Sequence, residues 1–126
     1  MHEWSLACEV VRQAEVEAAA RGAKRVLSVT VRAGVLTGIV PELLTRAYEM
    51  ARTGTVLEGA PLEVEVAPAR ARCPACRTES SFQDFVLVCP ACGAIGLQVL
   101  SGDEILLGRM EMELEESRVT EEGAHV

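Results

Sequence analysis

Four of the five cysteines of this chain belong to one short motif that occurs twice. The motif Cys-Pro-Ala-Cys stands at residues 73–76 and 89–92, with twelve residues between the two copies. A tight turn with this spacing points both thiolates at one ion, and a second turn completes a tetrahedral shell. Gly93 supplies the positive φ that such a turn often needs. The spacing therefore predicts a four-cysteine metal site formed by Cys73, Cys76, Cys89 and Cys92.

Zinc is the ion that this ligand set favours, although a rubredoxin-like iron site stays open because tetrahedral sulfur suits both metals. Four protein ligands leave no open position, which indicates a structural ion rather than a catalytic one. We expect Phe82, Phe85 and Val86 to pack over the ion, and metal binding to supply much of the folding free energy of this segment. The fifth cysteine, Cys8, is interpreted as a small buried hydrophobe in a helix.

A second set of potential ligands lies at the start of the chain, which reads Met1-His2-Glu3. The amine of Met1, the backbone nitrogen of His2 and its imidazole can close adjacent chelate rings around one ion. The backbone nitrogen of Glu3 can add a fourth ligand in the same plane, and Ni(II) and Cu(II) prefer square-planar nitrogen ligation. These residues allow two interpretations, a metal site or an ordinary chain terminus that binds nothing. Taken alone, they favour the second.

The elements that position these residues follow from hydrophobic periodicity. Helices are predicted from Ser5 to about Arg21 and from Pro41 to Gly54, and strands over 26–34, 62–66 and 104–114. This order predicts an α+β fold, a small three-stranded sheet with two helices on one face, plus an inserted zinc-ribbon-like subdomain with the double cysteine turn. The predicted domains are 1–68 with 103–114, the cysteine segment 69–102, and a frayed acidic tail 115–126.

Charge and composition exclude several classes of protein. The net charge of −7 over 126 residues argues against a nucleic-acid partner, and the local cluster of Arg70, Arg72 and Arg77 is interpreted as a solvated face. No apolar run is long enough to cross a membrane, and the N-terminus has no secretion signal, so a cytoplasmic location is expected.

The whole chain resembles the HypA/HybF family of nickel metallochaperones. The matching segments occur in order over nearly all of residues 1–114: Met-His-Glu-Trp-Ser at 1–5, Val-Arg-Ala-Gly at 31–34, Gly-Ile-Val-Pro-Glu-Leu-Leu at 38–44, Gly-Thr at 54–55, Glu-Gly-Ala at 58–60, both cysteine turns, and Ser-Gly-Asp-Glu-Ile-Leu at 101–106. Trp4 departs from the pattern, because an aliphatic residue is more usual there.

The resemblance implies a non-enzymatic protein with two metal sites. It implies that His2, with the backbone nitrogens of Met1, His2 and Glu3, carries Ni(2+), and that the four cysteines hold a structural Zn(2+). It also implies partners: the GTPase HypB, the [NiFe] hydrogenase large subunit precursor and, in some organisms, urease maturation proteins.

Two other functions are compatible with the cysteine motif alone. A zinc-ribbon module that binds nucleic acid or protein, without nickel transfer, would use the arginine cluster and would bind a polynucleotide in a salt-sensitive way. An electron-transfer protein would hold iron and show a one-electron couple. An enzyme fits least, because the chain offers two histidines and no nucleophile–base pair.

Overall fold

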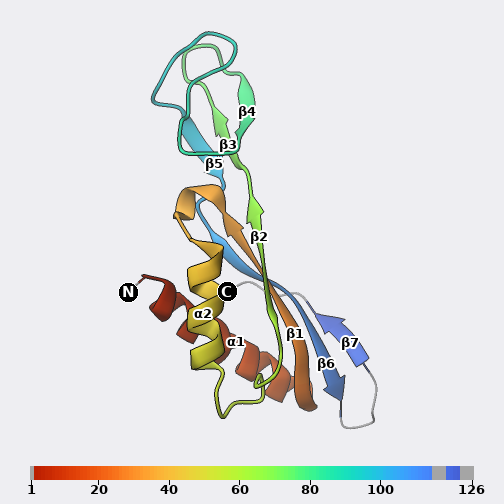
Figure 1. Ribbon diagram of the computed structural model, residues 1–126. Helices are drawn as coiled ribbons and strands as arrows, with labels where there is room; N and C mark the ends of the chain where they lie inside the picture. Colours follow the sequence, from red (N-terminus) through yellow and green to blue (C-terminus); the bar gives the residue numbers. More distant parts are fainter. Residues whose placement is uncertain (1, 115–118, 123–126) are drawn as a thin grey trace. The chain divides into compact units, whose positions relative to one another are not determined.

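The computed structural model describes residues 2–114 and the backbone of residues 119–122. In chain order the elements are α1 (His2–Ala20), β1 (Ala23–Gly34), the 3-10 helix η1 (Val35–Thr37), α2 (Pro41–Ala51), β2 (Leu62–Ala67), β3 (Ala69–Arg72), β4 (Glu79–Phe82), β5 (Gln98–Ser101), β6 (Ile105–Leu114) and β7 (Val119–Glu122) (Figure 1). The strands form a four-stranded sheet, β2-β1-β6-β7, and a three-stranded sheet, β4-β3-β5.

The chain divides into two compact units. Unit 1 comprises residues 1–32, 39–65 and 106–126, and unit 2 comprises residues 33–38 and 66–105. In this division residues 33–38, 66–68 and 103–105 group with the cysteine segment. No helix among the residues that the structure describes is long and apolar enough to span a membrane.

Unit 1 is the predicted α+β layer arrangement, with α1 and α2 packed on one face of the sheet (Figure 1). The buried residues of α1 recur every three or four positions, as the helical period requires: Ala7, Val10, Val11, Ala14 and Ala18. Leu44 and Tyr48 of α2 and Val29 and Val31 of β1 complete this core and are fully buried. On a more polar part of the sheet the Ser28 hydroxyl donates to Glu111 at 2.9 Å.

The two helices differ in how well their first residues were predicted. α2 begins at Pro41 as expected, because proline at the first helical turn needs no backbone N–H and has a helical φ. α1 begins at His2 instead of Ser5. Nothing between His2 and Ser5 interrupts a helix, and Glu3 in the first turn is stabilised by the positive end of the helix dipole.

The predicted frayed tail, 115–126, is partly replaced by a strand. Residues 115–118 and 123–126 lie outside the described residues, but residues 119–122 form β7, which pairs antiparallel with β6 through Met112 and Thr120. The larger sheet therefore has four strands, with the three predicted strands adjacent to one another. A four-residue edge strand depends on backbone pairing and shows little side-chain periodicity, which explains why the pattern missed it.

Unit 2 differs from unit 1 in having no large buried side chain among its described residues. Its buried apolar residues are all small: Ala33, Ala69, Ala71, Cys73 and Cys89. The expectation that Phe85 and Val86 pack over the ion is wrong, because these side chains are 63% and 66% exposed. Between the two cysteine turns, residues 79–82 form β4, which includes the half-buried Phe82. The residues that follow, among them Phe85 and Val86, lie in a loop.

Three segments of unit 2 approach one another closely where the chain enters and leaves the cysteine turns. The N–H of Gly34 donates to Glu104 O at 2.9 Å, and the N–H of Leu36 donates to Gly102 O at 2.8 Å. A Cβ atom added to Gly34 would lie 2.1 Å from Gly102 O, and one added to Gly102 would lie 2.5 Å from the Cα of Ala69. Both positions therefore require glycine.

Candidate metal centre

The first cysteine turn is closed by two backbone hydrogen bonds. The N–H of Arg77 donates to Cys73 O at 2.7 Å, and the N–H of Cys73 donates to Thr78 O at 2.9 Å. Arg77 adopts a left-handed conformation with φ of 65°, which costs a residue other than glycine about 1–2 kcal/mol. The turn therefore holds its first cysteine by its own backbone, before any metal is considered.

The second turn repeats this arrangement. The N–H of Gly93 donates to Cys89 O at 2.8 Å, and the N–H of Cys89 donates to Ala94 O at 2.9 Å. Gly93 has φ of 77°, as the sequence predicted for this position. The two turns thus have the same backbone hydrogen bonds and the same left-handed residue. Gly93 corresponds to Arg77, and Ala94 corresponds to Thr78.

The two turns bring the four predicted cysteine sulfurs together. The Sγ atoms of Cys73, Cys76, Cys89 and Cys92 all lie within 4.8 Å of one another. Cys73 Sγ is 3.6 Å from Cys92 Sγ, and Cys76 Sγ is 3.6 Å from Cys89 Sγ. A tetrahedral zinc ion with Zn–S bonds of about 2.3 Å separates its sulfurs by roughly 3.8 Å, whereas a disulfide needs about 2.05 Å. The geometry therefore fits a four-coordinate metal.

The ionisation of these thiols is uneven. The hydrogen bond between the Thr78 side chain and the Cys76 sulfur, and then the bond from the Thr78 backbone N–H, lower the pKa of the Cys76 thiol to about 6. The Ala94 N–H lowers the pKa of Cys92, but the Cys73 sulfur, burial and the two remaining sulfurs outweigh it and raise the value to about 12. Of these two thiols Cys76 loses its proton more easily, and a second negative sulfur beside it is costly. A bound cation removes that cost, because each ligand must lose its proton.

Burial divides the four ligands into two pairs. Cys73 and Cys89, the first residue of each turn, are buried, whereas Cys76 and Cys92 are exposed. One face of the cluster thus reaches the surface, yet all four ligand positions are filled by protein. Such a closed shell is typical of a structural ion.

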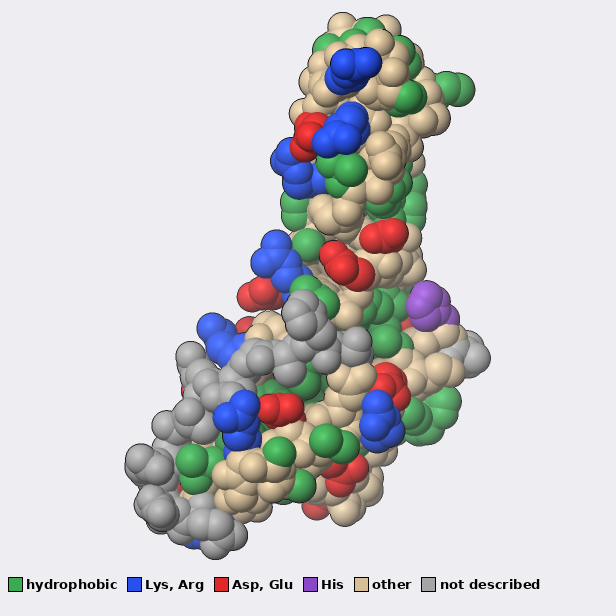
Figure 2. Space-filling model, turned by 180° about the vertical axis from the view of Figure 1, so that it is seen from behind, with side chains coloured by type: hydrophobic (Ala, Val, Ile, Leu, Met, Phe, Trp, Pro, Cys, Tyr) green, Lys and Arg blue, Asp and Glu red, His purple; other side chains and the backbone are tan. Residues whose placement is uncertain are grey.

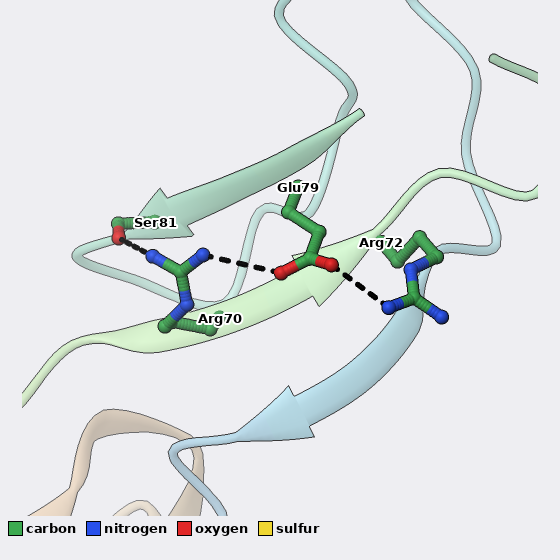
Figure 3. Close-up of polar contacts among 4 residues, drawn as sticks. All are labelled: Arg70, Arg72, Glu79 and Ser81. Atoms are coloured by element: carbon green, nitrogen blue, oxygen red, sulfur yellow. Dashed lines mark hydrogen bonds and ion pairs between the residues drawn. The ribbon is translucent and has the colours of Figure 1, made fainter. Parts of the chain in front are cut away.

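Two arginines of the cluster beside the centre, Arg70 and Arg72, share the carboxylate of Glu79 (Figure 3). Arg70 and Arg72, both on β3, reach Glu79 on β4 at 3.3 Å and 2.8 Å, and Arg70 also donates to Ser81 at 3.2 Å. The hydrogen bond from Arg72, and to a lesser extent the one from Arg70, lowers the pKa of the Glu79 carboxyl. On the face drawn in Figure 2, Lys and Arg side chains are interspersed with Asp and Glu side chains. This arrangement does not resemble the basic patch of a nucleic-acid-binding module.

The predicted nickel ligands belong to unit 1, at the beginning of α1. His2 is exposed and Glu3 is half-buried, while Met1 lies outside the described residues. The first four N–H groups of a helix have no intrahelical acceptor, so the backbone nitrogens of His2 and Glu3 make no helical hydrogen bonds. The cysteines and the N-terminal residues are thus placed by different units.

Two side chains, one in each unit, differ from expectation. Cys8 is exposed, not buried, because it is one residue away from the buried stripe and borders a surface groove with Trp4 and Met50. Thr78, whose Oγ1 lies 3.2 Å from Cys76 Sγ, was not singled out from the sequence. Its position two residues after Cys76 could have indicated that its hydroxyl contacts the cysteine sulfur.

Comparison with known proteins agrees with this arrangement. Residues 1–112 match the family described as "Hydrogenase/urease nickel incorporation, metallochaperone, hypA". The hydrogenase maturation factor HypA of Nitrosospira multiformis is 40% identical over 112 residues, covering 89% of this chain and 97% of the relative. That of Geobacter metallireducens is 40% identical over 113 residues, covering 90% of this chain and 100% of the relative.

A solved structure shows the same fold. The solution structure of the Ni metallochaperone HypA from Helicobacter pylori superposes with a TM-score of 0.67 at 25% identity, covering 91% of this chain and 100% of that one. The family match spans both the N-terminal residues and the cysteine turns. The chain therefore belongs to the HypA family of nickel metallochaperones for hydrogenase maturation, a family without catalytic activity.

Proposed function

We propose that this chain binds Ni(2+) through His2 and the backbone nitrogens of Met1, His2 and Glu3, and delivers it to the [NiFe] hydrogenase large subunit precursor. The GTPase HypB is its partner in delivery, and urease maturation proteins are a further class of partner, since the family description includes urease. Unit 1 is the nickel-binding part and unit 2 the zinc-binding part. The transfer takes place in the cytoplasm.

The observation that supports the nickel site is the position of His2 at the first residue of α1 within a family match that starts at residue 1. A five-membered chelate ring through consecutive backbone nitrogens needs both nitrogens on the same side of the Cα–C bond. The helical ψ of about −42° is much closer to that arrangement than the extended ψ of about +135°. The backbone nitrogens of His2 and Glu3 therefore need little rearrangement to chelate one ion.

The zinc assignment rests on the sulfur geometry and on the composition of unit 2. The four cysteines hold the ion, whose chemical contribution is to accept four thiolate ligands and so fix the two turns together. Unit 2 offers no other large buried group among its described residues, so metal binding supplies the folding free energy that an apolar core supplies elsewhere.

The decisive experiment is a calorimetric titration of Ni(II) into zinc-loaded protein with a free N-terminus. We expect wild type to bind about one nickel ion, and His2→Ala to bind at least about 100-fold more weakly, a loss of about 2.7 kcal/mol. His125→Ala is the matched control, because it removes the other histidine of the chain and should bind like wild type. Equal binding by wild type and His2→Ala would refute the proposal and favour the zinc-ribbon interaction module instead.

Nickel affinity should also depend on pH. The amine, the backbone nitrogens and the imidazole must all lose protons before they bind the ion, so affinity should rise as pH increases from about 6 to 8. The measurement is the same titration across this pH range, in buffers of different ionisation enthalpy. The dependence of the binding heat on the buffer gives the number of protons released. A constant affinity with no proton release would contradict the proposed ligands.

A further inference from the structure

The two cysteine turns are equivalent in backbone but not in the side chain that faces their second cysteine. In the first turn, Thr78 Oγ1 lies 3.2 Å from Cys76 Sγ. In the second turn the same place is occupied by Ala94, whose methyl group cannot donate a hydrogen bond. Thr78 and Ala94 are both half-buried, so the difference between them is chemical and not a difference of exposure.

This difference matters once the cysteines are ligands, because a metal-bound thiolate can only accept hydrogen bonds. The Thr78 hydroxyl then donates to Cys76, and branching at Cβ restricts the rotamers of its side chain. Hydrogen bonds to a charged sulfur stabilise its negative charge and make its lone pairs less available to an electrophile. Cys92 has no hydroxyl partner among the described residues.

Only the two exposed ligands, Cys76 and Cys92, need to be compared for their reactivity. Cys73 and Cys89 are 0% and 2% exposed, so a reagent in solution reaches Cys76 and Cys92 first. We propose that Thr78 is a positioning residue of the metal centre, which protects Cys76 and leaves Cys92 as the ligand where electrophilic attack and zinc release begin. This inference rests on the proposed zinc site.

The test is a competition between cysteines in the zinc-loaded full chain. N-ethylmaleimide is added in limiting amount; the sulfur lone pair forms the S–C bond, the adjacent carbon takes a proton from water, and the Zn–S bond breaks. Peptide mass spectrometry then gives the modified fraction of each cysteine over time. Cys8, an exposed cysteine of α1, is the internal reference whose rate should be the same in every variant.

We expect Cys92 to react about tenfold faster than Cys76 in wild type, within the range that an outer-shell partner contributes to a metal site. In Thr78→Val, which keeps the branched shape and removes the hydroxyl, the two rates should become similar. Thr78→Ser restores the hydroxyl and should restore the difference. Ala94→Thr adds a hydroxyl beside Cys92 and should slow its reaction.

Zinc release, followed with a colour-forming chelator, should track the modification of Cys92 in wild type. Equal rates at Cys76 and Cys92 in wild type, or a ratio unchanged by Thr78→Val, would overturn the inference. If Thr78→Val does not fold, the comparison of wild type with Ala94→Thr decides the same question. Zinc content is measured before labelling, so a chain without zinc refutes the metal site itself, whereas a zinc-loaded chain with equal rates refutes only the role of Thr78.

Discussion

Cys73→Ser should abolish zinc binding and unfold unit 2 while unit 1 stays folded. Cys73 is fully buried, its backbone closes the first turn, and its sulfur is one of four ligands. Structural zinc contributes about 10–16 kcal/mol to the folding of small zinc domains, far more than a segment with only small buried residues can replace. Unit 1 has its own core, including Val10, Val29 and Leu44, and does not depend on the ion.

The measurement combines zinc content with amide NMR spectra. Amide signals of residues 69–101 should collapse to unfolded positions in Cys73→Ser, whereas those of α1 and α2 should remain dispersed. Cys8→Ser is the matched control, because it removes an exposed thiol that is not part of the cluster, and it should keep both zinc and all signals. Chelation of zinc from wild type should reproduce the spectrum of Cys73→Ser. A variant that loses zinc but keeps unit 2 folded would contradict the prediction.

Gly34→Ala should destabilise unit 2 by about 3 kcal/mol, the upper part of the usual range for overpacking. The new Cβ would lie 2.1 Å from Gly102 O, and that carbonyl is held by the N–H of Leu36. Backbone atoms cannot rotate away as the end of a side chain can, so a strand must shift. The measurement is the urea midpoint of zinc release, which should fall markedly.

Gly38→Ala separates steric overlap from the conformational preference of glycine. Gly38 has φ of 71° and no neighbouring atom within 4 Å of an added Cβ. Alanine there should cost only the left-handed conformation, about 1 kcal/mol. If both variants shifted the midpoint equally, the close approach of Gly34 to Gly102 would not be the cause.

The sequence predicted the parts of the molecule whose signals are local. The spacing of the cysteine pairs is sufficient to place four sulfurs together, because each pair lies within one turn. Pro41 marks the start of α2, and the periodicity of α1 identifies its buried stripe. The α+β layer of unit 1 follows from these elements and was predicted correctly.

The rest depends on strand pairing and side-chain exposure that no local pattern marks clearly. β3 and β4 are four residues each, and their pairing is marked by the cross-strand contacts of Arg72 with Glu79 and of Arg70 with Ser81. Buried alanine alternates with exposed arginine in β3, but four residues are too few for that alternation to stand out, so only a cysteine-rich segment with a short hairpin was predicted. The exposure of Cys8 was missed because neighbouring helical positions differ by about 100° in direction, and Ala7 beside it is buried.

The lack of large buried side chains in the described part of unit 2 also determines how its stability varies with temperature. Phe85, Val86 and Ile95 are already in contact with solvent in the folded state, so unfolding exposes little additional apolar surface there. The heat capacity change of unfolding is dominated by newly exposed apolar area, so it should be small for this unit. Its stability curve then has little curvature, so stability is not lost on cooling. By mass action, each tenfold change in free zinc shifts its stability by about 1.4 kcal/mol, so metal supply outweighs moderate changes of temperature.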